Sequence, residues 1–114
     1  MANASLSAWA AKFLIAYINL DTAFSTYNPK TKGSGASLES ALKVMFSLRA
    51  ELVGILGTLN INAGSAATII KGLDAILNPI SGYYKNGGEQ RGSPPARPGR
   101  PLLIWFNQYI KPLL

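Results

Sequence analysis

The chain has 114 residues, contains neither Cys nor His, and carries 11 Lys and Arg against 5 Asp and Glu. Without Cys there are no disulfides, thiol nucleophiles or thiolate metal sites, and without His the commonest general base and metal ligand is missing. The acidic residues are scattered, which leaves little for paired-carboxylate chemistry. We therefore expect one non-enzymatic domain with no cofactor and no metal site.

The composition is unusually apolar for a small chain with a net charge of +6. Hydrophobic residues make up 48% of the sequence and charged residues only 14%, where about 25% charged is typical. A chain of this size has little interior in which to hide such residues, so we expect self-association or contact with a membrane. No secretory signal is recognised, because the first residues lack a basic group and Lys12 interrupts the apolar run. A virion or cytoplasmic location follows as an expectation.

The first predicted helix covers residues 5–25. Leu6, Trp9, Phe13, Ala16 and Leu20 recur at alternating spacings of three and four, as in a helix with one face in a core. Further apolar residues widen this stripe almost around the helix, which indicates burial on several sides. The helix should end before Pro29, since a residue that precedes proline disfavours helical geometry.

Two further helices are predicted over residues 38–58 and 65–77, joined by a short turn. Ser37 and Ser65 are suitable N-caps, and Pro79 should end the later helix. The expected core stripe of the 38–58 helix is Ala41, Met45, Leu48, Leu52, Ile55 and Leu59. Together the two helices form a helical hairpin.

The segment 85–101, here called the basic arm, contains four Gly, four Pro and three Arg. Such a composition predicts no helix or strand interior. An amphipathic helix should follow over residues 102–110, with Pro101 in its first turn. The fold class is therefore all-α: a helical core (1–84) with a central hairpin, the basic arm, and a C-terminal amphipathic segment (102–114).

The positive charge is concentrated in the connecting segments. Residues 79–114 hold five of the cations and a single acid, Glu89. Arginines on an extended arm can follow a phosphodiester backbone, and the neighbouring Tyr83, Tyr84 and Trp105 could stack on bases. The predicted nucleic-acid-binding residues are Lys30, Lys32, Lys85, Arg91, Arg97 and Arg100. The alternatives are that the basic arm hooks a neighbouring subunit or is a solvated linker.

The aromatic residues of the first and last helices are candidates for contacts between copies. If the C-terminal helix docks on a neighbouring subunit, a head-to-tail repeat of that contact builds rings or filaments. The predicted subunit-interface residues are Trp9, Phe13, Tyr17, Leu102, Trp105, Phe106 and Tyr109.

These patterns favour a self-assembling structural protein, such as a helical coat or nucleocapsid protein that packages nucleic acid through its phosphates. The expected partners are further copies of the chain and nucleic acid. The alternative is a membrane-linked helical assembly subunit, pilin-like or peripheral, because residues 52–70 carry no charge. A small adaptor that binds one partner protein is a third possibility.

Overall fold

The computed structural model describes residues 4–31, 33, 35–85 and 95–114, and these ranges contain helices and no strand. The all-α prediction is confirmed. Four α-helices are followed by a π-helical turn, η1, and a 3₁₀ turn, η2. Their bounds are α1 (Ala4–Thr26), α2 (Gly35–Thr58), α3 (Ala63–Lys85), α4 (Gly99–Trp105), η1 (Phe106–Ile110) and η2 (Lys111–Leu113).

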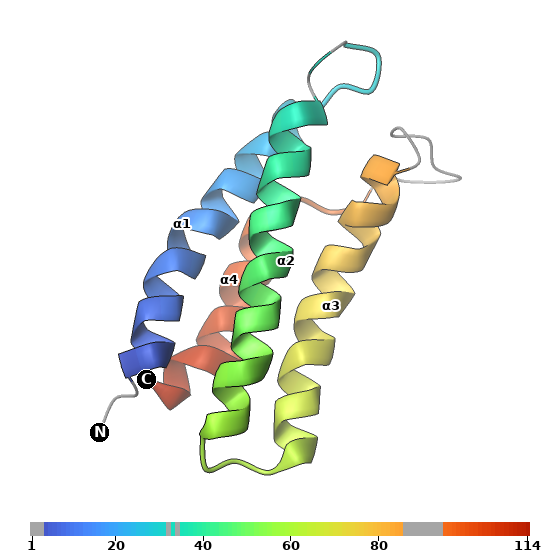
Figure 1. Cartoon of the computed structure of the whole chain (residues 1–114). Coiled ribbons are helices and arrows are strands. Elements are labelled where there is room, and N and C mark those ends of the chain that lie inside the picture. Colours follow the sequence, from blue (N-terminus) through green and yellow to red (C-terminus); the bar gives the residue numbers. More distant parts are fainter. Residues whose placement is uncertain (1–3, 32, 34, 86–94) are drawn as a thin grey trace.

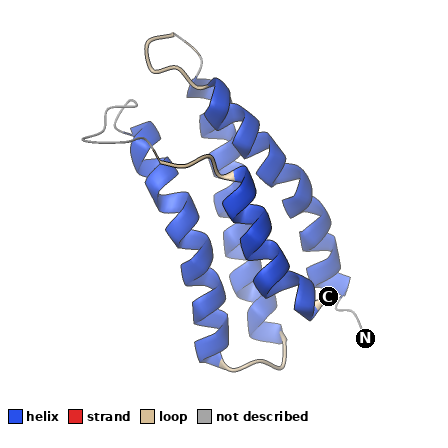
Figure 2. Cartoon of the chain, turned by 180° about the vertical axis from the view of Figure 1, so that it is seen from behind, coloured by secondary structure: helices blue, strands red, loops and turns tan. Residues whose placement is uncertain are grey.

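The long helices run up and down beside one another (Figure 1). α1 packs against α2, and α2 packs against α3. Seen from behind, α4 lies between α1 and α3 and contacts both (Figure 2). The four helices therefore surround one core, with the ends of α1 and α3 and the starts of α2 and α4 directed toward the same end of the molecule.

Both tryptophans lie in this core and satisfy their polar atoms there. The indole Nε1 of Trp9 donates a hydrogen bond to the carbonyl of Leu48 at 2.7 Å, and that of Trp105 donates to the carbonyl of Ile69 at 2.9 Å. The two rings also contact each other edge to face, with centroids 6.3 Å apart. Each indole thereby joins two helices through apolar contact and a buried hydrogen bond.

The helix starts differ from the predicted caps. α2 begins at Gly35, so Ser37 lies inside its first turn and not at the N-cap. α3 begins at Ala63, and the side-chain Oδ1 of Asn62 accepts a hydrogen bond from the backbone N–H of Ser65 at 2.7 Å. Asn62 therefore caps α3, and the prediction of Ser65 as the cap was wrong. Asn is among the most favourable N-cap residues, which explains why Asn62 and not Ser65 caps this helix.

α3 does not end at Pro79 as predicted, because it continues through Pro79 to Lys85. Proline removes one backbone hydrogen bond and usually breaks a helix. Here Leu77 and Ile80 on either side are buried in the core, and Pro79 itself faces solvent. The apolar contacts made beyond Pro79 hold the last turns of α3 in place.

The C-terminal segment contributes to the same core as the first three helices. The predicted 102–110 helix is α4 from Gly99, with η1 and η2 completing it. Leu102, Trp105, Phe106 and Ile110 are all buried. The basic arm is also shorter than predicted, since Lys85 ends α3 and residues 99–101 form the first turn of α4.

The uncharged 52–70 stretch is divided between the end of α2 and the start of α3 by the turn at residues 59–62. Among the described residues, no helix has the length and apolar character needed to cross a membrane.

Candidate nucleic-acid interface

Aromatic side chains hold together the end of the molecule at which α1 ends, α2 begins and α3 ends. Tyr27, just after α1, contacts Tyr83 and Tyr84 of α3, with ring centroids 5.9 and 5.8 Å apart. Phe24 of α1 also contacts Tyr83 at 5.8 Å. These contacts bring the end of α3 beside the end of α1, where the chain turns toward α2 (Figure 1).

Gly35, the first residue of α2, is part of this packing. A Cβ atom at this position would lie 3.0 Å from the ring of Tyr84, which is closer than ordinary contact. Partial burial, followed by the negative charge of Glu39, raises the pKa of the Tyr84 phenol. Tyr83 and Tyr84 are half-buried and pack against Tyr27, and Trp105 is buried in the core. None of the three presents a free ring for base stacking in this arrangement.

Three of the predicted phosphate-binding cations are exposed around this end. Lys30 lies in the loop after α1, Lys85 is the last residue of α3, and Arg100 lies in the first turn of α4. Lys85 is also well placed electrostatically, since a helix C-terminus favours positive charge. We call Lys30, Lys85 and Arg100 the basic end. Lys32 and Arg91 lie outside the described residues.

Arg97 differs from these three because it is engaged within the chain. Its guanidinium forms two hydrogen bonds with the Asp21 carboxylate of α1, at 2.7 Å to Oδ2 and 3.2 Å to Oδ1. Asp21 Oδ1 also accepts the backbone N–H of Gly99 at 3.1 Å. The hydrogen bonds from Arg97 lower the pKa of Asp21. Arg97 therefore fastens the start of α4 to α1, and its charge is neutralised there.

The remaining acids of the described ranges are paired in the same way. Asp74 binds Arg49 through both carboxylate oxygens, which joins α3 to α2 and lowers the Asp74 pKa. Two more pairs, Lys12 with Glu51 at 2.7 Å and Lys43 with Glu39 at 3.9 Å, lie on exposed surface. The described cations without an ion-pair partner are Lys30, Lys71, Lys85, Arg100 and Lys111.

Sequence reasoning missed the pairs that join distant parts of the chain. Asp21 and Arg97 are 76 residues apart, and Arg49 and Asp74 are 25 apart. No local spacing links such residues. Among the ion pairs of the described residues, only Glu39–Lys43 has the i,i+4 spacing that can be recognised in a sequence.

The residues predicted at a subunit interface are instead found inside this chain. Phe13 stacks on Phe106 with centroids 5.4 Å apart and also contacts Trp105 at 5.5 Å. Those three residues, together with Trp9 and Leu102, are buried, and Tyr17 and Tyr109 pack partly buried against them. An interface built from these side chains requires α4 to leave its own α1 and α3 and to occupy the equivalent place on a second copy.

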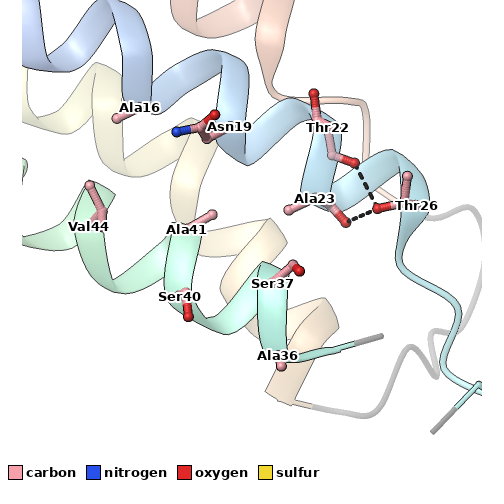
Figure 3. Close-up of a pocket in the computed structure, with 10 residues that line it drawn as sticks. All are labelled: Ala16, Asn19, Thr22, Ala23, Thr26, Ala36, Ser37, Ser40, Ala41 and Val44. Carbon is pink, nitrogen blue, oxygen red and sulfur yellow. Dashed lines mark hydrogen bonds between the residues drawn. The ribbon is translucent and has the colours of Figure 1, made fainter. Parts of the chain in front are cut away.

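A groove runs along the seam between α1 and α2. Near the basic end it has a volume of about 600 Å³ and is lined by small and hydroxyl-bearing side chains (Figure 3). Asn19 and Thr22 lie on its α1 side, with Ser37 and Ser40 on its α2 side. No charged residue lines this part, so it offers hydrogen bonds and van der Waals contact and no site for an ion.

Within the described ranges, no cluster of three or more His, Cys, Asp and Glu side chains could hold a metal ion. Comparisons of the chain with protein-family models, curated proteins and solved structures find no match. The function is therefore inferred from the arrangement of charged and apolar residues on the surface.

Proposed function

We propose that this protein is a non-enzymatic, self-assembling structural protein of the coat or nucleocapsid type, which binds nucleic acid through the phosphates at its basic end. The observation that carries the proposal is the distribution of ion pairs. Every acid of the described residues is paired with a cation. The cations left over include Lys30 after α1, Lys85 at the end of α3 and Arg100 in the first turn of α4.

Exposed cations without a carboxylate partner are the groups that contribute to phosphate binding. A phosphate contact releases counterions from the nucleic acid, and this gain is largest for a side chain that need not first break an ion pair. Contacts of this kind position a protein on the backbone and read no sequence. The expected ligand is thus DNA or RNA of any sequence.

The apolar surface supports the assembly part of the proposal. Ile15, Ile18 and Ile104 each expose more than half of their accessible area, at 65%, 54% and 53%. Scattered apolar residues are ordinary on a protein surface, whereas adjacent ones mark contact sites. Ile15 and Ile18 are neighbours on α1, so the surface favours association between protein molecules.

Sedimentation velocity of the purified protein without detergent, with and without DNA or RNA and across a salt series, tests the proposal. We expect large particles at low salt with nucleic acid and their dissociation as salt rises. The variant Lys30→Ala/Lys85→Ala should lose most of this response. The control Lys71→Ala/Lys111→Ala removes the same charge from unpaired cations elsewhere and should keep it.

A protein that sediments identically with and without nucleic acid contradicts the proposal. Equal losses in the two double variants would also contradict it, because net charge alone would then explain binding. A protein that stays in solution only with detergent would favour the membrane-linked alternative.

A further inference from the structure

One stripe of exposed residues along α1 carries no charge, and the exposed Lys12 beside it is ion-paired with Glu51. The residues of this stripe recur at helical spacing and are all exposed. They are Ser7, Ala11, Leu14, Ile15, Ile18, Thr22 and Ser25, here called the outer α1 face. Leu14, Ile15 and Ile18 lie in its middle with 38%, 65% and 54% of their area exposed. This face therefore lacks the charged residues that normally meet water on a helix surface, and its middle is apolar.

A groove lies beside this ridge. It occupies about 460 Å³ between α1 and α2. Ile15 and Val44, which is 52% exposed, line it together with the charged Lys12, Lys43 and Glu51. It shares Asn19 and Val44 with the groove near the basic end, so the two are continuous. The charged residues along the seam are ion-paired: Lys12 with Glu51 and Lys43 with Glu39. The outer α1 face is therefore uncharged, and the charges along the groove are balanced within ion pairs.

We propose that this surface binds a second copy of the same chain. The inference rests on the self-assembly in the proposed function and names the surface through which it occurs. Two chains of net charge +6 repel each other wherever unpaired cations meet. Contact through a neutral surface avoids that cost. Such a dimer leaves Lys30, Lys85 and Arg100 of both copies free for phosphate.

The shape of the surface suits two identical partners. A ridge formed by Leu14 and Ile18 lies beside a groove lined by Ile15 and Val44. In a twofold contact the ridge of each copy enters the groove of the other, so a single surface supplies both halves of the interface. A lipid surface would instead be met by free cations flanking the apolar face, and the cations beside this groove are paired.

The test compares two double variants in nucleic-acid-free, detergent-free buffer by sedimentation velocity over a range of protein concentrations. Ile15→Gln/Ile18→Gln changes the proposed surface. Val53→Gln/Ile104→Gln changes two other exposed aliphatic residues, outside the groove. We expect the wild-type protein and the control variant to dimerise. The dimer dissociation constant of Ile15→Gln/Ile18→Gln should rise at least about tenfold. Far-ultraviolet circular dichroism checks that each variant remains helical.

A wild-type protein that stays monomeric at all concentrations overturns the inference, as does an Ile15→Gln/Ile18→Gln variant that dimerises like the control. Uptake of the wild-type protein by phosphatidylcholine vesicles in place of dimerisation also overturns it. Nucleic-acid binding is measured separately by fluorescence anisotropy. A protein that dimerises through this surface but binds no nucleic acid would leave the inference standing and defeat the proposed function.

Discussion

Asp21 on α1 and Arg97 before α4 form a two-point ion pair across 76 residues of sequence, with Arg97 Nη2 lying 2.7 Å from Asp21 Oδ2. The same carboxylate accepts the backbone N–H of Gly99. One side chain of α1 therefore fixes both the last part of the basic arm and the first residue of α4. From this point α4 enters the core between α1 and α3.

The ion pairs of Asp21 and Asp74 predict a loss of stability in acid. Hydrogen bonds from Arg97 and Arg49 are the largest causes that lower the pKa of these carboxyls below the ordinary 3.8. The unfolded chain therefore takes up protons first as the pH falls. The stability from these pairs is fully present above 3.8 and is lost as the pH falls through the lower folded-state values. Urea midpoints measured from a pH of about 6 to about 3 should decrease.

The control for this pH dependence is Asp21→Asn/Asp74→Asn, which cannot titrate at either position. It should be less stable than wild type near neutral pH and show a shallower decline in acid. A decline as steep as that of wild type would mean that other groups govern the acid sensitivity.

Two glycines should respond to alanine in opposite directions. A Cβ at Gly99 would lie 2.7 Å from Cγ of Asp21, so Gly99→Ala displaces the carboxylate and lowers the free energy of unfolding. Nothing lies within 4 Å of a Cβ at Gly54, in the interior of α2. Gly54→Ala should therefore stabilise the protein by about 0.5–1 kcal/mol, through the higher helix propensity of alanine. Urea unfolding measures both, and a stabilising Gly99→Ala would contradict the described contact.

Trp105 is the side chain of the C-terminal segment with the largest expected effect on stability. It is 3% exposed, packs against Trp9 and Phe13, and donates a hydrogen bond to Ile69. Trp105→Ala should cost about 3–5 kcal/mol of unfolding free energy. Trp105→Phe keeps most of the ring contact and should cost less. If Trp105→Ala unfolds like wild type in urea, α4 does not pack in its own core.

The cap of α3 is tested by two neighbouring substitutions. Asn62→Ala removes the hydrogen bond to the N–H of Ser65 and should cost about 0.5–2 kcal/mol. Ser65→Ala leaves that bond intact, so its effect on the urea midpoint should be much smaller. A larger decrease of the urea midpoint for Ser65→Ala than for Asn62→Ala would contradict the assignment of Asn62 as the cap.

Helix periodicity predicted the buried side of α1 well, but it misplaced part of the stripe on α2. Leu6, Phe13 and Leu20 are buried as expected. On α2, Leu42 and Leu56 are buried, whereas the predicted Ala41 and Ile55 are only partly buried. α2 packs against both α1 and α3, so two adjacent stripes are apolar and a sequence does not say which one faces the centre.

The candidate site could be predicted only in part. The concentration of cations in the connecting segments suggested Lys30, Lys85 and Arg100, and all three are exposed in the structure. The same reasoning placed Arg97 among the phosphate-binding cations. Its ion pair with Asp21, 76 residues away, cannot be recognised from the neighbouring sequence. Which cations are free therefore depends on the tertiary fold.

The most direct test of the central claim compares Arg100→Ala with Arg97→Ala in fluorescence-anisotropy titrations of DNA and RNA across a salt series. The claim is that the unpaired cations Lys30, Lys85 and Arg100 bind phosphate, whereas Arg97, which is ion-paired with Asp21, does not. The slope of log affinity against log salt should fall by about 0.7–0.9 in magnitude for Arg100→Ala, as one phosphate contact is lost. Arg97→Ala should keep the wild-type slope. An unchanged slope for Arg100→Ala, or an equal fall for Arg97→Ala, would contradict the account.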